Sequence, residues 1–250
     1  MRIGRYNPAK ESRIMLKNSS QNTLKNTSKS LAFTLLVTLC GLSSHTWAHD
    51  CEQPHPAEQS NSPTSKLLEL KQQWAHAKYH TKRNDQKTAY KNTILDAEKL
   101  TSLHPDSAEA WVWQGIIKAS SASIKKGISA LITIKEARAD LEKGLSMSPE
   151  SSASFGNAVL GAIYHQVPKK PLGFKDTKKA QAYFDKALKQ APNSLDSNFL
   201  YAEYLLTIKE KEKAKTHLEI ALKAPQRANL TLADTGRKNE AQQLLLEISE

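Results

Sequence analysis

Four prolines, each at the end of a segment with regularly spaced apolar residues, constrain the fold of this chain more than any other feature. They are Pro105, Pro149, Pro192 and Pro225, which lie 44, 43 and 33 residues apart. Proline cannot continue a helix, and it disfavours the helical conformation of the residue before it. The segments that lead into the prolines are alike, as in EKLTSLHPDS (98–107), EKGLSMSPES (142–151), DKALKQAPNS (185–194) and EIALKAPQRA (219–228). The spacing therefore predicts successive helical units that each end at a proline.

The segments between the prolines have the composition and the periodicity of helices. Ala, Leu, Lys, Glu and Gln dominate them, and apolar positions recur three and four residues apart. The sequence has no sustained alternation of apolar and polar residues and no Asn-Gly hairpin signal. We therefore expect an all-α fold, and residues 66–250 are enough for one well-buried domain.

The units resemble the tetratricopeptide repeat (TPR) family across roughly residues 70–250, a family with a period of about 34 residues and Trp, Gly, Tyr, Ala and Pro landmarks. Trp111 and Gly115 match a first helix of that family, as do Leu160, Gly161 and Tyr164. Second-helix positions follow a small–large–small pattern in three units: Ala137, Leu141 and Gly144; Ala180, Phe184 and Ala187; Ala214, Leu218 and Ala221. The resemblance implies a right-handed TPR-like solenoid of antiparallel helix pairs, in which small residues allow two helices to approach closely.

In this register the units span about 67–105, 106–149, 150–192 and 193–225, and a single helix over 237–250 forms a C-terminal cap. The first unit departs from the pattern, with Thr93, Ala97 and Leu100 at its second-helix positions. The second and third units are about ten residues longer than the family's period. More distantly, the chain is similar to a group of exported bacterial repeat proteins, which resemble the periplasmic TPR component of some solute transporters.

Residues 1–48 have the order of segments of a secretory signal peptide. Basic residues precede an apolar run of twelve, LAFTLLVTLCGL (31–42), and SSHTWA follows it. The run is too short for a permanent membrane anchor, which needs about 20 residues. We expect cleavage after Ala48, with Met15 as an alternative start of the chain. This leader places the protein in the periplasm or outside the cell.

The charge of the chain is less informative than its net value of +11 indicates, because the leader contributes +6 of it and the remainder carries only +5. Such a mild, scattered excess is typical of a solvated surface, and we expect no nucleic-acid partner. After cleavage the only cysteine is Cys51, within a segment (49–65) whose composition predicts a disordered linker. A lone thiol outside the cytoplasm leaves disulfide pairing between chains, and so a homo-oligomer, open.

The TPR resemblance implies a concave face, lined by first helices, that binds a peptide or protein segment. By repeat register, the residues of this partner-binding groove are Glu109, Val112, Ile116, His165, Phe199 and Glu203. The leader makes another envelope protein or peptide the expected partner. The first hypothesis is therefore an exported, non-enzymatic binding or scaffold protein.

The alternative hypothesis is a small-molecule-binding accessory component of a solute-uptake system, with an enlarged turn as a pocket wall. The stretch HQVPKKPLGFKDTKKA (165–180) lies within the third unit and holds the candidate ligand-loop residues Lys169, Lys170, Phe174 and Lys175. The competing interpretation is a plain connector, with Asp176 as the N-cap of the following helix. A single glycine excludes a glycine-rich phosphate-binding loop.

The sequence carries no strong metal or catalytic pattern. His76 and His80 are four residues apart, as zinc ligands can be, but they lack an obvious third ligand. His49, Cys51 and His55 could chelate a metal only weakly from a flexible tail. No Gly-x-Ser-x-Gly motif is present. We expect no enzymatic activity, no cofactor and no metal site.

Overall fold

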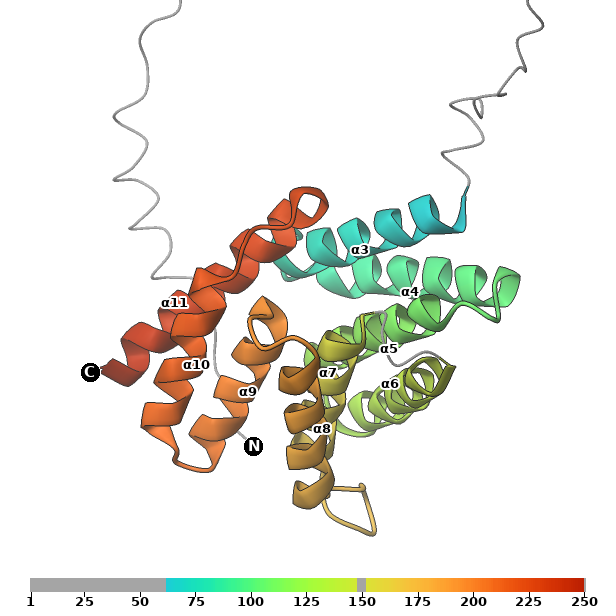
Figure 1. The fold of residues 1–250 in the computed structure, drawn as a ribbon. Coiled ribbons are helices and arrows are strands. Elements are labelled where there is room, and N and C mark those ends of the chain that lie inside the picture. The colour runs from blue at the N-terminus through green and yellow to red at the C-terminus, as the bar shows by residue number, and fades with distance from the viewer. Residues whose placement is uncertain (1–61, 148–151, 250) are drawn as a thin grey trace, which may run out of the picture. The chain divides into compact units, whose positions relative to one another are not determined.

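A computed structural model describes residues 62–147 and 152–249, and these residues are helical throughout apart from turns and loops (Figure 1). The prediction of an all-α fold is confirmed for them. The helices are α3 (Pro63–Tyr79), α4 (Gln86–Leu103), α5 (Ala108–Ser123), α6 (Gly127–Met147), α7 (Ala153–Gln166), α8 (Thr177–Gln190), α9 (Leu195–Thr207), α10 (Lys211–Lys223) and α11 (Thr231–Ser249), with a 3-10 turn at Ala228–Leu230.

The helix ends follow the local signals in the sequence. Helices α4, α8 and α10 each end two residues before a proline, at Leu103, Gln190 and Lys223. The expected stop at Pro149 lies outside the described residues. At the helix starts, the side chains of four N-cap residues accept a hydrogen bond from the first turn and so satisfy one of its free N–H groups. These residues are Ser62, Ser107, Asp176 and Ser194.

Consecutive helices pack as pairs, and each pair falls within one of the expected units. Helix α3 packs on α4, α5 on α6, α7 on α8 and α9 on α10. The first helices of successive pairs also contact one another, α3 with α5, α5 with α7 and α7 with α9. Helix α3 begins at Pro63, so the helical region starts before the expected boundary at residue 66 and includes the end of the expected linker.

The small–large–small positions form the contacts within the pairs. Ala180, Phe184 and Ala187 of α8 are fully buried, at 0% exposure. Gly161 of α7 faces Phe184 so closely that a Cβ atom there would lie 2.9 Å from the ring. The other positions of the pattern are buried as well: Ala137, Leu141, Gly144, Ala214, Leu218 and Ala221, and Thr93, Ala97 and Leu100 of the divergent first unit. Buried small residues therefore allow each second helix to approach its partner closely.

An aromatic cluster joins the first three pairs. The rings of Trp74 (α3), Trp113 (α5) and Phe155 (α7) meet edge to face, with centroids 5.4 to 5.9 Å apart. Trp111, at the position of the expected repeat Trp, is only half-buried, with the Lys143 ammonium 3.4 Å from its ring centroid. The tryptophan two residues beyond that position is therefore the one that packs between neighbouring pairs.

Helix α11 is more than a cap. It begins at Thr231, six residues before the expected start at 237, and it contacts α3 and α9 as well as α10. The last described helix thus meets the first (Figure 1). Within the described residues, no helix combines the length and the apolar character needed to cross a membrane.

Candidate functional site

Three residues of the expected groove are core residues. Val112, Ile116 and Phe199 are 0%, 1% and 5% exposed. Val112 and Ile116 are enclosed because the first helices of neighbouring pairs pack against one another. Phe199 is covered by α11, whose Arg237 guanidinium lies 4.6 Å from the ring centroid. The prediction that these three side chains line an open groove is therefore wrong for this structure.

Glu109 joins three helices through polar contacts. Its carboxylate accepts hydrogen bonds from Lys71 Nζ and from Ser152 Oγ, both at 2.7 Å. The indole N–H of Trp113 donates to the same Ser152 oxygen at 3.0 Å. Glu109 is thus half-buried in a network that ties α3 and α5 to the start of α7.

His165 links the ends of two first helices. Its Nε2 lies 2.7 Å from Thr207 Oγ1, and its ring meets Tyr204 edge to face at 4.9 Å. Burial, assisted by the charge of Lys175, lowers the pKa of His165, which favours the neutral imidazole. His165 therefore connects α7 with α9 at the edge where both helices end.

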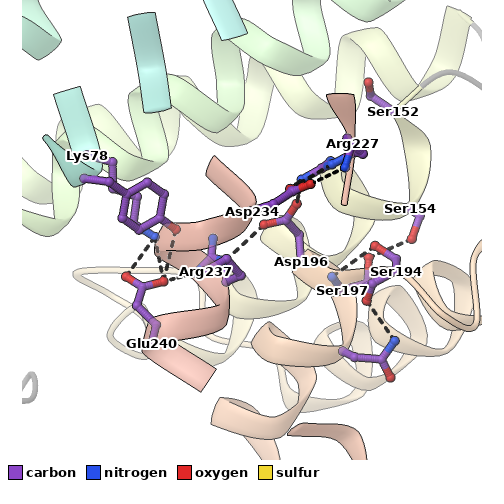
Figure 2. A network of polar contacts seen from close by, with 12 residues as sticks. Lys78, Ser152, Ser154, Ser194, Asp196, Ser197, Arg227, Asp234, Arg237 and Glu240 are labelled. Carbon is purple, nitrogen blue, oxygen red and sulfur yellow. Dashed lines mark hydrogen bonds and ion pairs between the residues drawn. The ribbon is translucent and has the colours of Figure 1, made fainter. Parts of the chain in front are cut away.

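The remaining groove residue, Glu203, lies beside a group of charges that sequence analysis did not anticipate. We define the charge cluster as Lys78, Asp196, Glu203, Arg237 and Glu240, contributed by α3, α9 and α11. At its centre the Arg237 side chain, only 5% exposed, donates from Nε to Asp196 Oδ1 at 3.0 Å and from Nη1 to Glu240 Oε2 at 2.7 Å (Figure 2). Arg237 thereby joins α11 to α9.

Asp196 is held by two guanidinium groups. Besides Arg237, it accepts from Arg227 Nη2 at 3.0 Å. Arg227 also binds Asp234, donating from its backbone N–H at 2.6 Å and from Nε at 2.9 Å. Burial alone would raise the pKa of Asp196, but the charges of Arg237 and Arg227 outweigh it and hold the pKa below its ordinary value. The carboxylate is therefore ionised and fully paired.

Helix α3 joins the cluster through Glu240. Lys78 Nζ and the Tyr79 hydroxyl both donate to Glu240, at 3.2 and 3.1 Å (Figure 2). Burial, together with the nearby charge of Arg237, lowers the pKa of Lys78 to about 8. The two helices are very close here, since a Cβ atom at Gly236 would lie 2.4 Å from the Tyr79 ring. A glycine on α11 therefore permits the contact with α3.

Glu203 differs from the other members of the cluster. It makes no hydrogen bond or ion pair with the described residues, although it lies near Arg237, Glu240 and Lys78. Burial raises its pKa, and the positive charges of Arg237 and Lys78 offset this only in part. The side chains of Lys78 and Glu240 remain 22% and 35% exposed. The cluster therefore contains one half-buried carboxylate that has no hydrogen-bond or ion-pair partner among the described residues and lies next to partly accessible charges.

The sequence held a partial signal for this cluster. Asp234, Arg237 and Glu240 recur every three residues, which places them on one stripe of a helix. That stripe could have indicated that α11 makes a polar contact, but it does not identify the partners. Lys78 is 162 residues from Glu240, and Asp196 is 41 residues from Arg237.

The candidate ligand loop has a packed base and an exposed tip. Phe174 packs edge to face on Tyr164 at 5.5 Å and under the Arg138 guanidinium at 4.2 Å. Lys175 is half-buried, whereas Lys169 and Lys170 are exposed. Asp176 is the N-cap of α8, accepting from the Lys179 N–H at 3.0 Å, as predicted. The four loop residues thus do not converge on a common site.

The other candidate ligands are separated or lie outside the described residues. His76 and His80 are exposed, with ring centroids 4.8 Å apart. In the part of the chain that the structure describes, no three His, Cys, Asp or Glu side chains form a group that could hold a metal ion. The expected cleavage site, Cys51, His49 and His55 are not among the described residues.

Comparison of the chain with known protein families and with curated proteins gave no match.

Proposed function

We propose that this protein is an exported, non-enzymatic binding or scaffold module with a right-handed TPR-like solenoid fold, and that its partner is an envelope protein or peptide. The leader-like segment supports export to the periplasm or beyond. The buried small–large–small positions in successive helix pairs support the TPR-like register.

Glu203 is the observation that carries the binding proposal. Glu203 is half-buried and has no hydrogen-bond or ion-pair partner among the described residues, and burial raises its pKa because it removes part of the water that would solvate the charge. A cationic side chain of a partner would supply a donor to this carboxylate. The binding surface that we propose is therefore the charge cluster, and its preferred ligand is a peptide segment with a Lys or Arg.

The enlarged turn gives the small-molecule alternative no comparable support. Phe174, the expected apolar wall of a pocket, packs edge to face on Tyr164 and lies under the Arg138 guanidinium. Lys169 and Lys170 are exposed at the tip of the turn.

Replacement of Glu203 by Gln tests the proposal with two measurements. Because the pKa of Glu203 is raised on folding, the folded state binds its proton more tightly, and ionisation above the ordinary value of 4.5 costs stability. We expect Glu203→Gln to increase the free energy of unfolding at pH 7 by roughly 0.5–1 kcal/mol. The same change should weaken capture of the partner in crosslinking from an envelope extract.

Glu136→Gln is the matched control, because Glu136 is an exposed carboxylate on α6. It should change neither stability nor capture. If the Glu203→Gln variant captures the same partners as the wild-type chain with unchanged yield, the charge cluster is not the binding surface.

A further inference from the structure

The loop between α7 and α8 presents a leucine to solvent. Leu172 is 70% exposed, and Lys169, Lys170 and Pro171 beside it are exposed too. A large apolar side chain at a protruding tip contributes nothing to the core. A single exposed apolar residue is common on protein surfaces, so the significance of Leu172 depends on its surroundings.

The backbone of the loop is held in place, so Leu172 is displayed by an ordered tip. Gly173 N–H donates to Lys169 O at 3.1 Å, and Lys175 N–H donates to Pro168 O at 3.0 Å. Asp176 N–H donates to Tyr164 O at 3.0 Å, which ties the loop to the end of α7. Phe174 packs inward, so of the two large apolar residues only Leu172 points outward.

The surroundings of Leu172 are basic, and the nearby carboxylates already have partners. Lys169, Lys170, Lys178 and Lys179 are exposed on the loop and the first turn of α8. Asp176 caps α8, and on the adjoining α6 Glu142 accepts a hydrogen bond from the Tyr164 hydroxyl at 2.7 Å. The tip thus combines one exposed apolar side chain, Leu172, with an excess of lysines over carboxylates.

The neighbouring turn also presents an exposed apolar residue. The contact between His165 and Thr207 brings the end of α9 beside the end of α7, and both turns lie at the lower edge of the view in Figure 1. In this second turn Ile208 is 41% exposed and Lys209 is exposed. Two adjacent turns therefore each present an apolar residue, with mainly lysines beside Leu172 and with both lysines and the carboxylates of Glu210 and Glu212 beside Ile208.

We propose that this edge, formed by the α7–α8 loop and the α9–α10 turn, docks on an anionic phospholipid surface. Leu172, and less deeply Ile208, enter the interface between headgroups and acyl chains, while the lysines contact lipid phosphates. Lysine near an anionic bilayer strengthens binding about fivefold per residue, and a shallow apolar insertion adds to it. A protruding leucine suits a bilayer better than an acidic protein, which would need a matching pocket. This inference does not depend on the proposed function of the charge cluster.

A fluorophore that reports local polarity, placed at either of two positions, tests the proposal in the full chain. Cys40 and Cys51 are replaced by Ser, and the fluorophore is attached through Leu172→Cys or, as the matched control, Leu103→Cys. Leu103 is 65% exposed at the end of α4, on the edge where α5 begins. Because the probe reports its own surroundings, binding of the leader segment to vesicles does not produce the signal.

We expect vesicles of phosphatidylcholine mixed with phosphatidylglycerol to shift the emission of the probe at position 172 to shorter wavelength, and pure phosphatidylcholine to leave it unchanged. The probe at position 103 should not respond. Adding Lys169→Glu and Lys170→Glu should raise the lipid concentration needed for half of the shift by at least about tenfold, and salt should do the same.

Three results would overturn the proposal. They are no shift at position 172 with anionic vesicles, equal shifts at positions 172 and 103, and a response of the probe at position 172 to polyglutamate but not to vesicles. The last result would identify an acidic protein surface as the partner of this edge.

Discussion

The contact between α7 and α8 and the contact of α11 with α3 and α9 hold helices together by different means. In the first, Gly161 faces the ring of Phe184, and Ala180 and Ala187 on either side are fully buried. In the second, the buried Arg237 side chain binds the buried Asp196 and the partly exposed Glu240. The first contact is stabilised by apolar burial, which is nondirectional, and the second by ion pairs that depend on geometry.

This difference has energetic consequences. Burial of apolar surface contributes about 25 cal/mol per Å² and depends little on pH or salt. A buried ion pair gains little net free energy over an apolar pair of similar shape, because both ions lose their water. Loss of one partner is costly, however, because the other charge stays buried. The α11 contact should therefore be the one that solution conditions and single charge changes affect most.

The largest expected effect tests the apolar contact. Phe184→Ala removes a ring that is 0% exposed and leaves a cavity beneath Gly161. We expect the free energy of unfolding to fall by about 3–5 kcal/mol, measured by urea unfolding followed by circular dichroism. Leu95→Ala, at a position that is 54% exposed on α4, should change it by less than about 0.5 kcal/mol. Equal effects of the two changes would show that the small–large–small positions do not carry the stability of the pairs.

The apolar contacts could be predicted from the sequence because their signals are local. A proline two residues beyond a helix, a serine or Asp176 at a helix start, and small residues spaced by a helical turn each act within a few positions of the chain. The burial of Ala137, Leu141 and Gly144 follows from the same pattern. Local rules were thus sufficient for the helix ends at these prolines and for the contacts within each pair, although not for the starts of α3 and α11.

The α11 contact could not be predicted because its cause is nonlocal. Whether Phe199 faces a groove or the core depends on where α11 docks, and that depends on Lys78, far away in the chain. The repeat register likewise assigns the family's Trp position to Trp111, which is only half-buried. Trp113 is the buried one because it meets Trp74 and Phe155 of the adjacent pairs.

The next prediction tests the ionic contact. Arg237→Met keeps much of the side-chain volume but leaves Asp196 with Arg227 alone and Glu240 with Lys78 and Tyr79. We expect the free energy of unfolding to fall by about 3 kcal/mol. This value is near the lower end of the range for a broken buried ion pair, because both carboxylates keep a partner. Hydrogen exchange should accelerate more in α11 and α3 than in α7 and α8.

Arg138→Met is the control for that change. The Arg138 side chain is 32% exposed, and its Nε lies 3.7 Å from Glu142. An ion pair of this kind contributes at most about 1 kcal/mol. If the two Arg→Met variants lose equal stability, or if exchange in α11 is unchanged in Arg237→Met, the charge cluster does not hold α11 in place.

The smallest predicted effect distinguishes the two contacts by their pH dependence. Burial and the charge of Arg237 lower the pKa of Lys78 from its ordinary 10.5 to about 8. At a pH between about 8 and about 10, Lys78 is therefore protonated to a greater extent in the unfolded chain than in the folded chain. The free energy of unfolding should therefore rise, by about 1–2 kcal/mol, as the pH increases from about 8 to about 10. At higher pH the rise should reverse, because burial raises the pKa of Tyr79 and Tyr90, and these side chains ionise more readily in the unfolded chain.

Urea unfolding across this pH range, for the wild-type chain and two lysine variants, measures the effect. Lys78→Met should abolish the rise, whereas Lys91→Met, at an exposed position on α4, should keep it. Phe184→Ala should lower the whole profile with little change in its slope between about pH 8 and about pH 10, because the phenylalanine side chain has no proton to lose or gain. A rise that persists in Lys78→Met would mean that burial of Lys78 at the contact between α11 and α3 does not cause the pH dependence. The contrast between an apolar and an ionic contact would then not hold for α3.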